Sequence, residues 1–280
     1  MMLLHCIVRT FLQYQLPRLS VQALATRSIQ RASNTYQSIG KVRIMSSKSA
    51  TENDTLNEVV DLAKLRQDYS SITIDESTLD SDPFNVFEKW FNDALEAKAH
   101  EPNAMCLATC DPQTCMPSAR MVLLKGFDHE GFVWFTNYNS RKGQELETNP
   151  NAALCFWWPE LERSVRIEGM VSKVSPEESN EYFGKRPPTA RVGAVSSNQS
   201  QTIADQQTLQ QKFQHLQNEY LNEDGTLKKE LPRPSHWGGY RLKPLIVEFW
   251  KGRASRIHDR IRYLRSATDD EGWTKERLQP

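Results

Sequence analysis

The sequence lacks the features that mark membrane-spanning and zinc-binding proteins. No apolar run in its 280 residues approaches the ~20 residues that a spanning helix needs. Its five cysteines form no Cys-x-x-Cys pair and have no clustered histidines, whereas a zinc site needs about four ligands at defined spacing. We therefore predict free thiols in a reducing compartment, no metal and no membrane partner. The length fits one large domain or two small ones.

Acidic residues are absent from the first 51 positions, although the formal net charge is zero. This stretch holds seven of the 35 basic residues, which leaves 28 basic and 35 acidic residues in the rest of the chain. An acidic body argues against nucleic-acid partners, because these need a basic footprint. An acid-free start rich in Arg and Ser is typical of a mitochondrial targeting peptide. We therefore predict a mitochondrial location, with a shorter cytosolic form if synthesis begins at Met45; a tail without an address is the alternative.

Three regions are predicted along the chain. Residues 1–48 are a targeting or disordered peptide, residues 49–81 a mobile N-terminal segment, and residues 82–280 the folded domain. The domain begins at Asp82-Pro83, since Asp is a favoured N-cap and Pro a favoured first helical residue. Apolar residues then follow at helical spacing, which indicates a core-facing helix: Phe84, Phe87, Phe91 and Leu95, with Trp90 adjoining.

A β-rich region follows this helix. Strands are predicted over residues 105–110, 118–125, 132–136, 152–158 and 164–174, with closing strands around Tyr240 and over residues 246–250 and 260–264. Short turns between successive strands favour an antiparallel barrel. Helices are expected after Ser140, after Ser175 and over residues 203–221.

Basic and hydroxyl residues recur in four separate segments. Arg120 and Lys125 end an apolar run, and residues five apart in a strand point to opposite faces, so each can serve a different anion. Further cations and hydroxyls follow in Ser140-Arg-Lys-Gly143, Gln199-Ser200 and Arg256-Ile-His-Asp-Arg260. Together they predict a folded site for phosphorylated small molecules.

Several longer motifs resemble the pyridoxine (pyridoxamine) 5'-phosphate oxidase family. They are Ser118-Ala-Arg-Met-Val-Leu-Leu-Lys-Gly126, Phe135-Thr-Asn137, Trp237-Gly-Gly-Tyr240, Glu248-Phe-Trp250, the segment Arg256–Arg260 and Glu276-Arg-Leu-Gln-Pro280. Their order and spacing extend from about Arg66 to Pro280. The resemblance implies an α+β fold, an FMN-binding split β-barrel that is antiparallel and Greek-key-like with surrounding helices. It also implies a homodimer with FMN at the subunit interface.

The resemblance also implies the residues of the site. A flavin phosphate needs fixed donors such as the planar fork of Arg and the point charge of Lys. The positions matched to FMN are Arg120, Met121, Val122, Leu123, Phe135, Thr136, Arg141, Lys142, Gln199, Ser200, Trp250 and Arg260. Those matched to the substrate are Lys125, Tyr182 and Arg186 at its phosphate, Arg256 and His258 at its ring as the catalytic pair, and Arg66 and Tyr69 in a covering segment.

The activity implied is oxidation of pyridoxamine or pyridoxine 5'-phosphate to pyridoxal 5'-phosphate. A hydride would pass to the flavin, and O2 would reoxidise the flavin to give hydrogen peroxide. Arg256-x-His258-x-Arg260 is expected to lie on one strand face.

Two positions depart from the family pattern. Ser164 stands where members usually carry a Gln that reaches the flavin, and Ala190, followed by Arg191, stands where members carry a Ser that contacts the substrate phosphate. A catalytically weakened relative that carries FMN or pyridoxal phosphate is therefore the alternative. Another split-barrel flavoprotein, such as a flavin reductase, is a third reading that the Arg256–Arg260 segment disfavours.

Overall fold

The computed structural model describes residues 62–65, 68–70, 72–266 and 272–280. The chain divides into two compact units, residues 1–67 and 68–280, and the described part of the first is the short 3-10 helix η1 (Leu62–Leu65). Within the described residues, no helix is both long and apolar enough to cross a membrane. The division into residues 1–48, 49–81 and 82–280 stays a prediction, because most of the first two regions lies outside the described residues.

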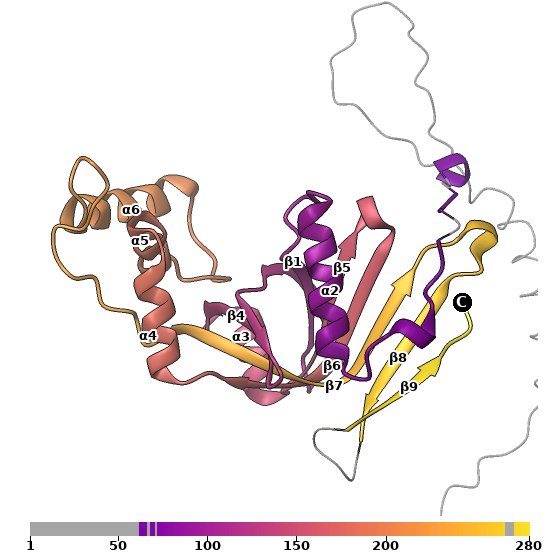
Figure 1. Cartoon of the computed structure of the whole chain (residues 1–280). Helices are drawn as coiled ribbons and strands as arrows, with labels where there is room; N and C mark the ends of the chain where they lie inside the picture. The colour runs from indigo at the N-terminus through magenta and orange to yellow at the C-terminus, as the bar shows by residue number, and fades with distance from the viewer. Residues whose placement is uncertain (1–61, 66–67, 71, 267–271) are drawn as a thin grey trace, which may run out of the picture. The chain divides into compact units, whose positions relative to one another are not determined.

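An antiparallel sheet of nine strands forms the body of the second unit (Figure 1). Seven strands are ordered β2-β1-β5-β6-β7-β4-β3, and β8 pairs with β7 and with β9. The strands are β1 (Ala104–Cys110), β2 (Pro117–Leu123), β3 (Gly126–Asp128), β4 (Gly131–Asn137), β5 (Asn151–Trp158), β6 (Arg163–Lys173), β7 (Trp237–Lys251), β8 (Asp259–Arg265) and β9 (Trp273–Arg277).

Strand β7 holds the two halves of the sheet together. Its first residues, from Trp237 to Leu242, pair with β4, and its last, from Ile246 to Lys251, pair with β8. Its other edge pairs with β6 from Tyr240 to Lys251, with a register shift between Glu168 and Gly169. Such irregularities bend a strand and increase its twist. The two halves therefore curl apart, and the predicted split β-barrel with surrounding helices is confirmed.

Helix α2 (Pro83–Glu96) covers the core face of the sheet. Asp82 caps it by accepting a hydrogen bond from the Phe84 amide at 2.9 Å, as predicted. Phe87 is fully buried and packs edge-on against the rings of Phe132 and Phe156. The predicted apolar stripe is wrong at its last member, because Leu95 is 51% exposed while its neighbour Ala94 takes the buried position in that turn.

Four further helices flank the sheet: α3 (Arg141–Thr148), α4 (Pro176–Lys185), α5 (Pro188–Ser196) and α6 (Gln206–Tyr220). Ser140 and Ser175 cap α3 and α4 as expected. Helix α5 was not anticipated, since it follows α4 after two residues and has no polar N-cap. Helices α4, α5 and α6 gather beyond the end of β7 that begins with Trp237 (Figure 1). A small core of Val192, Leu221 and Leu231 joins α5 to α6 and the segments that follow.

Candidate active site

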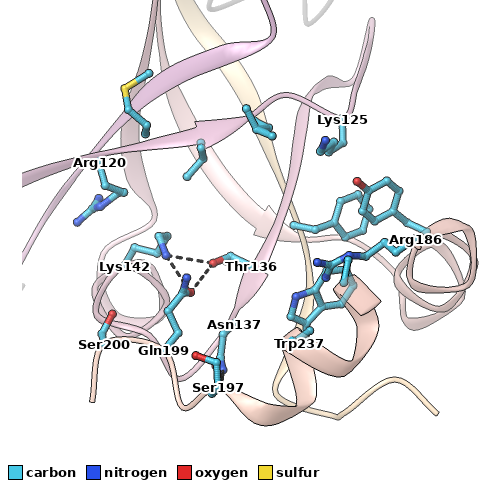
Figure 2. Close-up of a pocket in the computed structure, with 18 of the residues that line it drawn as sticks. Arg120, Lys125, Thr136, Asn137, Lys142, Arg186, Ser197, Gln199, Ser200 and Trp237 are labelled. Carbon is cyan, nitrogen blue, oxygen red and sulfur yellow. Dashed lines mark hydrogen bonds between the residues drawn. The ribbon is translucent and has the colours of Figure 1, made fainter. Parts of the chain in front are cut away.

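A cavity of about 1030 Å³ lies between the edge strand β2, strand β4 and helices α3 to α5. Its volume is at the upper end of the ~300–1,000 Å³ usual for small-molecule sites. The predicted site residues that line it are Arg120, Met121, Val122, Leu123, Lys125, Phe135, Thr136, Arg141, Lys142, Tyr182, Arg186, Gln199 and Ser200. Figure 2 shows Arg120, Lys142 and Ser200 toward one end of this cavity, and Lys125 and Arg186 toward the other.

The first end is organised by a buried carboxylate that sequence reasoning missed. Glu145 accepts hydrogen bonds from Thr109 at 2.5 Å, Ser118 at 2.8 Å, Arg141 at 2.8 Å and Arg120 at 3.2 Å. Burial by itself raises its pKa, but these hydrogen bonds and the charge of Arg120 outweigh burial and lower the pKa of Glu145 to about 2. Glu145 is therefore ionised and fixes both guanidinium groups at the cavity wall. Its place four residues after Arg141, one helical turn on, was the available signal.

Lys142 supplies a third cation to this end and has only neutral hydrogen-bond acceptors. Its Nζ donates to Thr136 Oγ1 and to Gln199 Oε1, both at 3.1 Å, as the dashed lines in Figure 2 show. Burial, followed by the charge of Arg120, lowers the pKa of Lys142 to about 8, although Glu145 acts in the opposite direction. A buried ammonium whose charge is only partly neutralised by its neighbours favours binding of an anion beside it.

The loop that carries Gln199 is held to β4 by further contacts. Asn137 Nδ2 donates to the Ser197 carbonyl at 3.3 Å, and Thr136 Oγ1 donates to Gln199 Oε1 at 3.0 Å. Ser200 has a positive φ of 72°, which turns the chain at the cavity edge. Asn137 and Ser197 were not predicted as site residues, although Asn137 closes the Phe135-Thr-Asn137 motif.

Aromatic rings wall the second end. The Tyr182 ring stacks on Phe135 with centroids 3.9 Å apart, and Trp237 lies nearly parallel to both. The Arg186 guanidinium lies 4.8 Å from the Trp237 ring centroid, a cation–π distance. Burial is the main cause that lowers the pKa of Arg186. Lys125 is exposed at the rim, so the wall and the rim both present positive charge to the cavity.

Strand alternation does not separate Arg120 from Lys125, contrary to the prediction. Strand β2 ends at Leu123, and the Lys125 amide bonds to the Val133 carbonyl of β4 at 2.8 Å. The two cations line one cavity and lie toward different ends of it (Figure 2). The chain turn after β2 therefore sets their separation.

Ala190 lines the same cavity, and its neighbour Arg191 has another task. Arg191 Nε donates to the Arg186 carbonyl at 2.8 Å, and its Nη2 donates to the Gly184 carbonyl. Both carbonyls lie at the C-terminal end of α4, where backbone acceptors have no partner within the helix. Arg191 thus caps α4 and does not replace the hydroxyl that Ala190 lacks.

The remaining predicted residues form a second cluster outside the cavity lining. Trp250 and His258 have ring centroids 4.8 Å apart, and Tyr69 lies edge-on to both at 5.7 Å. His258 Nδ1 accepts a hydrogen bond from the Arg253 amide at 3.1 Å. Burial first, and then the charge of Arg256, lower the pKa of His258. The imidazole is therefore held neutral, with one nitrogen tied to the backbone.

Arg260 and Arg256 complete the second cluster on different kinds of backbone. Arg260, on β8, donates to Glu248 at 2.8 Å, and this buried carboxylate also accepts from Arg166 at 2.8 Å. The prediction that Arg256, His258 and Arg260 share a strand face is wrong. Arg256 ends the short helix η4 (Ala254–Arg256) with a φ of 62°, and β8 begins only at Asp259.

Two other positions were named from the sequence, Arg66 and Ser164. Arg66 lies outside the described residues. Ser164 pairs with Trp250 across β6 and β7, and its Oγ lies 3.6 Å from Cys155 Sγ. It therefore shares the sheet face of the second cluster. Trp237 also lines the cavity, although it was not predicted as a site residue. It begins the motif Trp237-Gly-Gly-Tyr240, which could have indicated it.

Comparisons with known proteins show which family this chain resembles. Residues 91–220 match the family model described as pyridoxamine 5'-phosphate oxidase, and residues 237–280 match the pyridoxine 5'-phosphate oxidase C-terminal dimerisation region. The solved structure of PhzG from Burkholderia lata in complex with tetrahydrophenazine-1-carboxylic acid superposes with a TM-score of 0.68 at 27% identity, covering 75% of this chain and 100% of that one.

Curated relatives are closer in sequence. The pyridoxine/pyridoxamine 5'-phosphate oxidase of Trichormus variabilis is 53% identical over 219 residues, which cover 78% of this chain and 98% of that protein. The protein of the same name from Paraburkholderia phymatum is 51% identical over 219 residues, covering 78% and 99%.

These relatives correct the predicted location. They come from cyanobacteria and from Burkholderia and its kin, which have no mitochondria, so the prediction of a mitochondrial targeting peptide is wrong. An acid-free basic stretch is a compositional signal, and composition alone does not separate a targeting peptide from other basic segments.

The match therefore rests on two family models, on relatives at about half identity over most of the chain, and on a shared split-barrel fold. Residues 237–280, which carry Trp250, His258 and Arg260, are the family's dimerisation region. The chain belongs to the pyridoxine/pyridoxamine 5'-phosphate oxidase family and is an oxidoreductase.

Proposed function

We propose that this protein oxidises pyridoxamine 5'-phosphate and pyridoxine 5'-phosphate with O2 to pyridoxal 5'-phosphate and hydrogen peroxide, using FMN as its cofactor. The observation that carries the proposal is one large cavity with two separate cationic ends. A flavin mononucleotide and a phosphorylated pyridine together present two phosphates and two flat rings. The names of the curated relatives support the same substrates.

The first end fits the FMN phosphate. Arg120, Arg141 and Lys142 bring three positive charges, and Glu145 neutralises one of them. The remaining charge of about two matches a phosphate dianion. Gln199 and Ser200 add polar donors at the edge. Charge-assisted hydrogen bonds from such fixed groups are the strongest that a neutral-pH site can offer.

The edge strand β2 is proposed to lie along the flavin ring. Met121 is 66% exposed and Leu123 is 38% exposed, so both offer apolar surface at the cavity mouth. FMN, when bound, supplies the hydride acceptor and passes the electrons to O2. The side chains of the cavity bind and orient the cofactor and the substrate, and they partly exclude water.

The second end is proposed to bind the substrate phosphate. Lys125 supplies a point charge at the rim, Arg186 a planar fork, and Tyr182 a phenolic hydroxyl. The Trp237 and Phe135 rings hold Arg186 and Tyr182 in place. Fixed orientation of these groups places the reacting carbon of the substrate toward the middle of the cavity.

The second cluster is proposed to complete the site of the partner subunit in a homodimer. Trp250, His258 and Arg260 lie in the dimerisation region and do not line the cavity of their own chain. The face of the sheet that carries Trp250 and Trp157 also carries Met121, because these residues follow one another across paired strands with the same side-chain parity. Large exposed apolar side chains on one sheet face indicate an interface.

The catalytic pair is Arg256 and His258 in this proposal. Arg256 is exposed and free to meet the charge of a substrate ring, and the neutral His258 orients the exocyclic group with the ring nitrogen not held by Arg253. Neither residue is assigned as a general base.

A second candidate function is a relative that carries FMN or pyridoxal phosphate with weakened catalysis. Ser164 and Ala190 favour it, since the first is too short to reach far beyond its own strand and the second offers no hydrogen bond. One assay decides between the two. Purified protein is titrated with FMN, then given pyridoxamine 5'-phosphate while peroxide is followed. FMN binding without peroxide contradicts the oxidase; failure to bind either FMN or pyridoxal 5'-phosphate, titrated separately, contradicts both.

A further inference from the structure

The Tyr69 side chain is seated on a backbone position that has no room for a side chain. A Cβ added at Gly252 would lie 2.7 Å from Tyr69 Cγ and 2.9 Å from Cδ1, inside van der Waals contact. From this seat the Tyr69 ring meets Trp250 at an interplanar angle of 85° and His258 at 75°. Close approach of a side chain to a backbone is a specific reason for glycine.

A network of hydrogen bonds fastens the next residue. The Ser70 amide donates to both carboxylate oxygens of Glu162 at 3.0 Å, and Ser70 Oγ donates to Glu162 Oε2 at 2.7 Å. Lys251 Nζ donates to Glu162 Oε2 and to the Leu161 carbonyl, both at 2.9 Å, and to Ser70 Oγ at 3.1 Å. We call Ser70, Glu162 and Lys251 the latch.

The latch joins three segments that are far apart in sequence. Glu162 lies in the turn between β5 and β6 with a φ of 52°, and its carbonyl accepts from the Gly252 amide at 2.8 Å. Lys251 ends β7, is only 6% exposed, and pairs with Arg163 across the sheet. The buried Lys251 ammonium donates to one carboxylate, one carbonyl and one hydroxyl, and these three bonds fix its position.

The Glu162 carboxylate of the latch stays ionised at neutral pH. Hydrogen bonds from Ser70 are the largest influence on Glu162, and with the charge of Lys251 they outweigh burial and lower the pKa of Glu162 to about 2. Glu162 therefore accepts the hydrogen bonds of Ser70 and Lys251 as a carboxylate.

We propose that Glu162 and Lys251 are positioning residues, which hold Tyr69 against His258 through Ser70, with Gly252 as the seat. This inference rests on the proposed function, in which His258 faces the substrate. The Arg253 amide holds the imidazole on one side, and the Tyr69 ring limits it on another. Together they fix the ring orientation that a bound substrate meets.

The rest of the segment is attached independently of the latch. The Ile74 amide donates to Asp259 at 3.0 Å, and the Tyr263 hydroxyl donates to the Asp80 carbonyl at 2.8 Å. Loss of the latch should therefore free residues 68–70 and leave the attachment of residues 72–80 and the fold in place. If the latch only stabilised the fold, its loss would disturb residues 72–80 as well as residues 68–70.

The sharpest test is a double-mutant cycle between Gly252→Ala and Tyr69→Ala in the FMN-loaded protein. Gly252 has no positive φ, so alanine strains no backbone and acts only through the ring above it. Each single variant should weaken pyridoxal 5'-phosphate binding, measured by calorimetry, by roughly three- to tenfold, and the double variant should be no weaker than either single one. Additive losses of affinity in the double variant would contradict the proposal that Gly252 acts by making room for the Tyr69 ring.

Hydrogen exchange of the Ser70 amide, followed by mass spectrometry, reads the latch without substrate. Glu162→Ala should speed this exchange at least about tenfold and weaken pyridoxal 5'-phosphate binding as Tyr69→Ala does. Glu160→Ala, at an exposed carboxylate two residues away, is the matched control and should change neither. Faster exchange with unchanged binding would overturn the positioning role. An inactive wild-type enzyme that still shows both effects would contradict the proposed function alone.

Discussion

The two clusters of candidate residues differ in how they are completed. The cavity cluster gathers Arg120, Lys142 and Arg186 from β2, α3 and the end of α4 around one space within a single chain. The second cluster places Trp250 and His258 on the dimerisation region, outside that space. A set of residues that resemblance assigns to one site is thus divided by the fold into a group that lines the cavity and a group that lies outside its lining.

The difference extends to the buried carboxylates of the two clusters. Glu145 lies between Arg120 and Arg141 and turns their charge toward the cavity of its own chain. Glu248 lies between Arg166 and Arg260 on the other sheet face, next to exposed apolar side chains. The first cluster should bind a ligand in an isolated chain, whereas the second should matter only in the dimer.

The largest single effect is expected at the first end of the cavity, which is proposed to bind the FMN phosphate. Arg141→Ala should remove one charge-assisted contact to the phosphate of the proposed FMN, and such contacts contribute about 1.5–3 kcal/mol. FMN affinity, measured by flavin fluorescence quenching, should therefore fall at least about tenfold. Arg262→Ala is the control, because Arg262 pairs with Glu276 away from the cavity and should leave FMN affinity unchanged.

A pH effect should sharpen the assignment of Lys142. Its pKa of about 8 lies below the ordinary lysine value, and a phosphate beside it favours the protonated form. FMN affinity should therefore be highest below about pH 8 and decline as pH rises through that value. In Lys142→Arg the decline should disappear, since arginine stays charged. An unchanged pH profile in this variant would exclude Lys142 as the cause.

The smallest effect is expected at Ala190. Ala190→Ser restores a hydroxyl at the substrate end, and its hydrogen bond should contribute about 1.5 kcal/mol, the lower end of the range for hydrogen bonds to charged groups. KM for pyridoxamine 5'-phosphate should decrease up to about tenfold with kcat nearly unchanged, because the phosphate is remote from the reacting carbon. Arg191→Gln should lower thermal stability with little change in KM, since Arg191 caps α4. A sharp rise in KM there would show that Arg191 binds phosphate after all.

Local patterns predicted the parts of the fold that local forces decide. Asp82 and Ser140 cap helices where their side chains satisfy free amides, and short turns set the antiparallel strands. Leu95 and the Arg256 segment were misjudged because periodicity shows neither how far round a helix the core reaches nor where a strand begins. Leu95 is exposed while its neighbour Ala94 is buried, and Arg256 lies in a left-handed turn before β8.

The site was predictable in membership and not in arrangement. The motifs around Arg120 and Lys142 identified residues that do line the cavity. Glu145 was missed, since an acid beside cations looks like an ordinary surface helix pair until its burial is known. The separation of His258 from the cavity is a matter of topology, and no short-range pattern in one chain encodes it.

Each site of the proposed homodimer combines the cavity of one chain with Arg256 and His258 of another. Complementation tests this directly: inactive Lys125→Ala and Arg256→Ala variants are mixed under conditions that exchange subunits, and peroxide formation is measured. Random pairing gives one intact site in each mixed dimer, so activity should recover to about a quarter of wild type. A mixture of Lys125→Ala and Arg186→Ala, both within the cavity, should recover nothing. No recovery with the first pair, or equal recovery with both, would contradict the shared site.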